Sequence, residues 1–173
     1  LDEPKVRKVL EIENTIDYLS DNITKFMITF RGADLPEQDL LALGRLHHVI
    51  IDLERIGDRA ENIAEYAVGL IDVKERMTSE ALKELERISE KTKALFKKSL
   101  EVFAARELTN PDEIESIKRE TDIMQRDYTE NHIHRLQEEL CRPHTGIVFT
   151  NMMASIERIA SHSVNIAYSV KAE

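Results

Sequence analysis

Apolar residues recur at three- and four-residue spacing along almost the whole chain, and glycine or proline interrupts them at few places. The first run, "VRKVLEIENTIDYLSDNITKFMITF", keeps this spacing from Val6 to Met27. Such a period is that of an amphipathic helix with one apolar face. The breaks are "RGADLPEQ" at 31–38, "DVKERMTS" at 72–79, "LTNP" at 108–111 and "CRPHTG" at 141–146. The pattern therefore predicts five long helices.

The predicted helices start and stop at recognisable signals. The second is expected from about Pro36 to Ile71, the third over 79–108, and the fifth from Pro143 nearly to the end. The fourth has the clearest start, with Asn110 as cap, Pro111 in the first turn and Glu113 three residues after the cap. Because the connections are short, successive helices should be antiparallel. The predicted fold class is all-α, an antiparallel helical bundle.

Composition agrees with this fold and narrows the function. Charged residues make up 33% of the 173 residues and aromatic residues 5%, which suits long helices better than a turn-rich sheet. The net charge of -9 argues against nucleic acid as a partner, because nucleic acid binding needs a basic surface. No run of 18 apolar residues is present, so we expect no membrane insertion of this segment. A single cysteine excludes an internal disulfide framework and fits a reducing, intracellular compartment.

Two segments of the chain repeat each other. "LERIGDRAENIA" at 53–64 and "IERIASHSVNIA" at 156–167 are identical at six of twelve positions, at an offset of 103. The first and fourth predicted helices echo each other at an offset of 105. We therefore expect a single domain over 1–173 with an incomplete first repeat at 1–72 and a second repeat at 77–171. The second repeat has one more helix, so a matching helix is expected ahead of Leu1.

Acidic residues line one face of the second predicted helix. Glu54, Asp58, Glu61 and Glu65 lie at offsets of 0, 4, 7 and 11, which places them on one stripe of a helix. Glu13 and Asp17 form a similar pair on the first helix. By spacing alone such acids are most simply a solvated face, because isolated carboxylates one turn apart repel only weakly.

The internal repeat changes how these acids are interpreted. The counterparts of Glu13, Glu54, Asp58, Glu61 and Glu65 are Lys118, Glu157, Ser161, Val164 and Tyr168. The helical frame thus persists where most of the acids are absent, which suggests a sheltered face that needs counterions. Metal cations with oxygen ligands are one candidate. An ion-pair network with Arg31, Arg45, Arg55 and Arg59 is the other, and the sequence leaves both open.

Signatures of catalysis are missing from the sequence. There is no glycine-rich phosphate loop and no Gly-x-Ser-x-Gly elbow. No histidine follows a glutamate by three residues, as a di-iron bundle enzyme would require. His132 and His134 point to opposite faces of a helix, and Cys141 with His144 flanks a proline turn without the surroundings of a catalytic thiol. The chain is expected not to be an enzyme.

Three stretches together resemble a known family. "DLERIGDRAENIAE", "IERIASHSVNIA" and "ENHIHRLQEELCRPHTGIVFTNMMASIERI" are similar to the PhoU-like cytoplasmic domain of bacterial sodium/phosphate cotransporter proteins, over nearly the whole chain. The resemblance implies two three-helix repeats, of which the first lacks its leading helix here. It also implies a regulatory module of phosphate uptake on the cytoplasmic side of the bacterial inner membrane. A free-standing PhoU-type regulator of phosphate import and signalling is the alternative, and a metal-dependent bundle enzyme is a third reading.

The resemblance also implies a metal cluster, of iron or zinc, held by Glu/Asp-x-x-x-Asp motifs. Those motifs are intact at Glu13 with Asp17 and at Glu54 with Asp58. Weaker candidate ligands are Glu61, Asp122 and Glu157, because the second-repeat motifs are broken by Lys118 and Ser161. The expected partners are a transmembrane transporter portion of the same parent chain and a second copy of this chain.

Overall fold

The computed structural model describes residues 3–30 and 35–170 and contains five helices. They are α1 (Glu3–Ile28), α2 (Glu37–Asp72), α3 (Ser79–Ala105), α4 (Pro111–Gln137) and α5 (Pro143–Tyr168). No strand occurs within the described ranges, so the predicted all-α helical bundle is confirmed. The predicted repeat boundaries at 1–72 and 77–171 stay a prediction.

Side-chain signals in the sequence fix several helix ends. The Asn110 side chain accepts a hydrogen bond from the Glu113 backbone amide at 3.3 Å, so the predicted start of α4 is confirmed. Thr78 caps α3 in the same way, through the Ala81 amide at 3.2 Å. At its other end α3 stops at Ala105, three residues before the predicted Leu108, because Arg106 has a left-handed backbone with φ of 56°.

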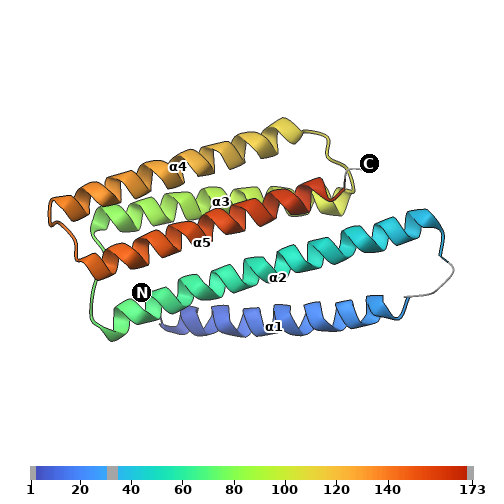
Figure 1. Cartoon of the computed structure of the whole chain (residues 1–173), viewed down its shortest axis with the longest axis horizontal. Helices are drawn as coiled ribbons and strands as arrows, with labels where there is room; N and C mark the ends of the chain where they lie inside the picture. The colour runs from blue at the N-terminus through green and yellow to red at the C-terminus, as the bar shows by residue number, and fades with distance from the viewer. Residues whose placement is uncertain (1–2, 31–34, 171–173) are drawn as a thin grey trace.

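Helix α5 lies at the centre of the arrangement and contacts α2, α3 and α4 (Figure 1). Its residues Phe149, Met153 and Ala160 are fully buried, and Ile88 and Leu95 of α3 pack in the same apolar core. Helices α3 and α4 also contact each other, so α3, α4 and α5 form a three-helix group.

Helix α1 is the least packed element. Among the described helices it contacts α2 alone, along the side of α2 that faces away from α5 (Figure 1). Gly57 of α2 allows close packing there, because a Cβ at this position would meet the Ile16 side chain at 3.4 Å. The counterpart of Gly57 in the repeat is Ala160. The α1–α2 pair is therefore joined to the three-helix group through α2.

The seam between α2 and α5 carries a polar contact in addition to apolar packing. His162 Nδ1 lies 2.8 Å from Asp52 Oδ1, and the Asn165 amide donates to the same oxygen at 3.2 Å. In the part of the chain that the structure describes, no helix combines the length and apolarity that crossing a bilayer requires.

Candidate metal centre and its counterpart

Helices α1 and α2 bring three carboxylates together. One oxygen from each of Glu13, Asp17 and Asp58 lies within 4.8 Å of the other two. Glu13 and Asp17 share one face of α1 because they are one turn apart, and Asp58 reaches them from the facing turn of α2. We call Glu13, Asp17 and Asp58 the first acid cluster.

Glu13 is the buried member of this cluster, with 7% of its surface exposed. Its pKa is raised to about 7, first because burial disfavours the charged form and then because it shares a hydrogen bond with Asp17. The negative charges of Glu61, Asp17 and Asp58 raise the pKa of Glu13 further. The cluster thus concentrates negative charge around a carboxyl that water barely reaches.

The donor set fits a metal cation. Ligand oxygens on a shared cation at roughly 2.0–2.6 Å lie at most about 4–5 Å apart, so the three carboxylates are within reach of one ion. Carboxylate oxygens suit Mg²⁺, Ca²⁺ and Mn²⁺ and are also found on zinc and iron. A bound cation would relieve the repulsion that raises the pKa of Glu13. The metal assignment itself stays a prediction.

The other acids of the α2 stripe lie in different surroundings. Glu61 is half-buried and close enough for its charge to act on Glu13. Glu54 is half-buried but lies outside the group of three, and Glu65 is exposed. The geometry thus gives Asp58 a place beside Glu13 and Asp17 that it does not give Glu54.

The arginines that could have neutralised these acids do not do so in the described ranges. No ion pair joins Arg45, Arg55 or Arg59 to the first acid cluster in residues 3–30 and 35–170. The Arg59 Nε is buried without a hydrogen-bond partner, and Arg55 is exposed. Arg31 lies outside the described residues. The ion-pair alternative therefore gains no support from the described arginines.

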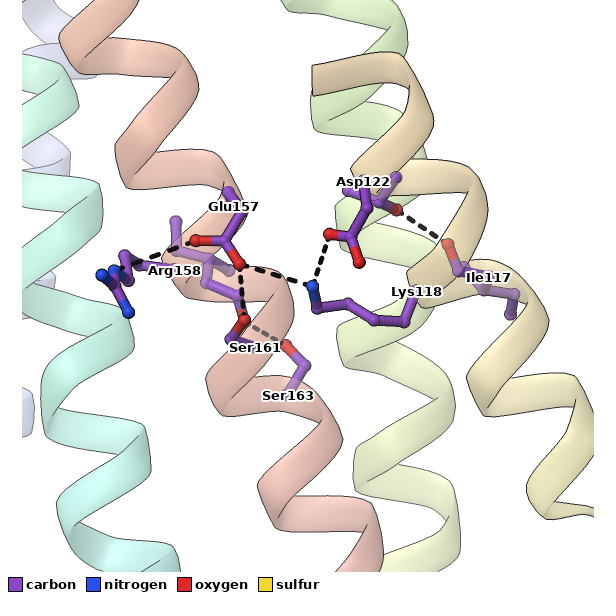
Figure 2. Close-up of polar contacts among 9 residues, drawn as sticks. Ile117, Lys118, Asp122, Glu157, Arg158, Ser161 and Ser163 are labelled. Atoms are coloured by element: carbon purple, nitrogen blue, oxygen red, sulfur yellow. Dashed lines mark hydrogen bonds and ion pairs between the residues drawn. The ribbon is translucent and has the colours of Figure 1, made fainter. Parts of the chain in front are cut away.

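The corresponding position between α4 and α5 is built differently, as Figure 2 shows. The Lys118 ammonium lies 2.5 Å from Asp122 Oδ1 on its own helix and 3.4 Å from Glu157 Oε1 on α5. The Ser161 hydroxyl donates to the same Glu157 oxygen at 2.7 Å. We call Lys118, Asp122, Glu157 and Ser161 the second cluster. Here both acids face a cation that the chain itself supplies.

From the sequence, Lys118 was predicted only to remove a metal ligand. Its ion pairs with Asp122 and Glu157 were not predicted. The exchange of Glu13 for Lys118 is visible in the repeat, and that signal was sufficient to suggest a replacement cation. It also missed the buried Glu84, which accepts two bonds from Arg135, at 3.1 and 2.6 Å. Glu84 and Arg135 are 51 residues apart, so no local spacing reveals the pair.

The histidines take structural positions in the described part of the chain. His132 is 3% exposed and stacks on Phe149 with ring centroids 4.5 Å apart, whereas His134 is exposed. His144 lies 2.9 Å from Glu75, whose pKa is lowered by hydrogen bonds from His144 and Arg142. These contacts join the α2–α3 connection to the start of α5.

Both the sequence and the fold are similar to those of known proteins. The sequence matches the PhoU domain family over residues 1–67 and 85–170. It is 25% identical to a Thermotoga maritima protein named phosphate-specific transport system accessory protein PhoU homolog 1, over 98% of this chain and 73% of that protein. The crystal structure of PhoU from Pseudomonas aeruginosa has the same fold, with a TM-score of 0.87, 22% identity, and coverage of 98% of this chain and 80% of that one.

Proposed function

This chain belongs to the PhoU domain family, and we propose that it is a free-standing, non-catalytic accessory protein that regulates phosphate transport. The observation that carries this proposal is the match, over 98% of this chain, to a protein named as an accessory of a phosphate-specific transport system. That relative supports the free-standing alternative better than a regulatory module within a sodium/phosphate cotransporter. The proposed partner is a component of a phosphate transport system on the cytoplasmic side of the bacterial inner membrane.

We also propose that the first acid cluster binds a metal cation in this role. Glu13 is buried among acids and has no basic partner in the described residues, so the pair of helices α1 and α2 is completed by a cation from solution. Metal bound to Glu13, Asp17 and Asp58 would draw α1 and α2 together at the point where α1 has no other helix to hold it. Divalent or trivalent ions such as iron or zinc fit the carboxylate donors.

The transport proposal is tested by expressing this chain alone in a bacterium that lacks its own PhoU-type accessory protein. We expect the rate of phosphate uptake to change relative to the empty vector at the same external phosphate concentration. Uptake that changes only when the chain is fused to a transmembrane transporter would instead favour the cotransporter module. Uptake that changes in neither case would contradict both.

The metal proposal is tested by elemental analysis of protein purified without chelator. We expect metal in the wild type and its loss in the variant Asp17→Asn with Asp58→Asn. Glu65→Gln is the matched control, because it removes an exposed acid from the same helix as Asp58. Equal metal content in all three proteins would exclude the first acid cluster as the site.

A further inference from the structure

We propose that Lys118 is a built-in cation that closes the second cluster to metal and so confines metal binding to the α1–α2 pair. This inference rests on the proposed metal binding of the first acid cluster. The second cluster occupies the equivalent position in the other half of the chain. There the acids Asp122 and Glu157 remain, but Lys118 and Ser161 replace the other two acids.

The geometry gives Lys118 the position of a bridging cation. Its side chain is 17% exposed, and its ammonium contacts one carboxylate from each of two helices, at 2.5 Å on α4 and 3.4 Å on α5 (Figure 2). A surface lysine that happened to meet an acid would keep its ammonium in water. Lys118 instead joins α4 to α5 as a metal shared between two helices would.

The remaining donors of the second cluster are already engaged. Glu157 Oε1 accepts from Ser161 at 2.7 Å as well as facing Lys118, and Glu157 Oε2 lies 3.8 Å from Arg158 Nε. Both carboxylates therefore have counterions within the chain. A metal entering here would have to approach the Lys118 ammonium within a few ångströms and would be repelled by it.

The two clusters differ at two counterpart positions, and both differences oppose metal in the second. Glu13 corresponds to Lys118, which replaces a negative charge with a positive one, and Asp58 corresponds to Ser161, which removes a negative charge. Asp17 corresponds to Asp122 and Glu54 to Glu157, so those acids are kept. The contact between α4 and α5 is thus bridged by Lys118 without metal, whereas that between α1 and α2 has no such cation and offers its carboxylates to a metal.

The test moves the metal site from one half to the other. The background is Asp17→Asn with Asp58→Asn, which disables the first acid cluster, and the added changes are Lys118→Glu with Ser161→Asp. Binding of Mn²⁺, and separately Zn²⁺, is measured by calorimetry on the full chain. We expect the background to bind at least tenfold more weakly than the wild type, and the fourfold variant to regain about one ion per chain.

The outcomes separate this inference from the proposed function. A fourfold variant that is helical by circular dichroism yet binds no ion overturns the role of Lys118. If the wild type and the background bind equally, the proposed metal site has failed, and the gain in the fourfold variant still tests Lys118 independently.

A second measurement covers the case in which the fourfold variant does not fold. In buffer with chelator, Lys118→Met removes the ammonium and leaves Asp122 and Glu157 without it, so the midpoint of thermal unfolding should fall by roughly 2–8 °C. Lys118→Arg keeps the charge and serves as the matched control, with a smaller fall expected. A Lys118→Met protein as stable as the wild type would contradict the proposed bridging role of Lys118.

Discussion

At the scale of single residues, the two halves of the chain treat buried charge in opposite ways. In the three-helix group, Glu84 is paired with Arg135 and Lys118 with Asp122, so each buried charge has an opposite partner. In the α1–α2 pair, Glu13 is buried beside Asp17 and Asp58 instead. Burial of a charge without a partner opposes folding, so Glu13 destabilises the protein when no cation is bound.

We predict that Glu13→Gln stabilises the protein at pH 8 in the presence of chelator. The folded-state pKa of Glu13, about 7, lies above its ordinary value of 4.5. The wild type therefore loses stability as the pH rises from about 4.5 to 7, because the unfolded chain releases this proton first. The free energy of unfolding by urea measures the effect. Glu11→Gln, which changes an exposed acid on the same helix, is the control, and a less stable Glu13→Gln protein would contradict the prediction.

A second prediction concerns His132. Its pKa is lowered from 6.5, first by burial and then by the charge of Arg135, against a smaller opposing effect of Glu84. The contribution of His132 to stability is thus complete above pH 6.5 and is lost as the pH falls toward the lower folded-state pKa. Urea unfolding at pH 7.5 and 5.5 should show a smaller loss of stability in His132→Gln than in the wild type. An equal loss in both proteins would argue against this assignment.

At the scale of helices, start signals are local and could be read from the sequence, whereas some ends and most contacts could not. The cap at Asn110 and the proline starts at 111 and 143 were predicted because each acts within one turn. The end of α3 at Ala105 depends on a left-handed Arg106, for which the sequence has no glycine signal.

At the candidate metal site, too, features set within one helix could be predicted from the sequence, whereas features set by helix packing could not. The one-turn spacing of Glu13 and Asp17 predicted a shared face, and the structure places both beside Asp58. The difference between Asp58 and Glu54 arises from how α1 and α2 are packed, which no spacing within one helix determines. The role of Lys118 depends likewise on Glu157, 39 residues away in sequence.

Substituting alanine for two of the helix glycines is expected to change the stability of the protein in opposite directions. Gly44 has nothing within 4 Å of an added Cβ, so Gly44→Ala should stabilise α2 by up to about 1 kcal/mol through helix propensity. At Gly146 an added Cβ would lie 2.9 Å from His132 Nε2 and 3.0 Å from the Leu136 side chain. Gly146→Ala should therefore destabilise the protein, by about 1–3 kcal/mol as overpacking does. Chemical unfolding of the two variants checks both signs, and stabilisation by both would contradict the packing of α4 on α5.

At the scale of the whole molecule, α1 is held on one side only. Ile12, Leu19 and Ile23 are 49%, 50% and 42% exposed. Their counterparts at an offset of 105, the residues Ile117, Met124 and Tyr128, pack against the apolar core of the three-helix group. The sequence period thus predicted helix α1, but not that these apolar residues of α1 lie largely exposed. The expectation of a further helix ahead of Leu1 stays a prediction.

This asymmetry predicts the order of local opening. Backbone amides of α1 should exchange with deuterium faster than those of α5, because α1 packs on one helix and α5 on three. Hydrogen exchange followed by mass spectrometry measures both helices in one experiment. Adding Mn²⁺ or Zn²⁺ should slow exchange in α1 and leave α5 unchanged, since the first acid cluster joins α1 to α2. Equal exchange rates in α1 and α5 would contradict this order.

Among the described helices α1 contacts α2 alone, and α2 packs on the three-helix group against α5 and against Leu85 of α3. An effect of ions bound at the first acid cluster would therefore reach the three-helix group through α2. The Asp52–His162 contact is one of the polar contacts between α2 and α5. We expect a substitution of Asp52 to weaken the attachment of the α1–α2 pair to α5 while leaving both clusters intact, because Asp52 belongs to neither.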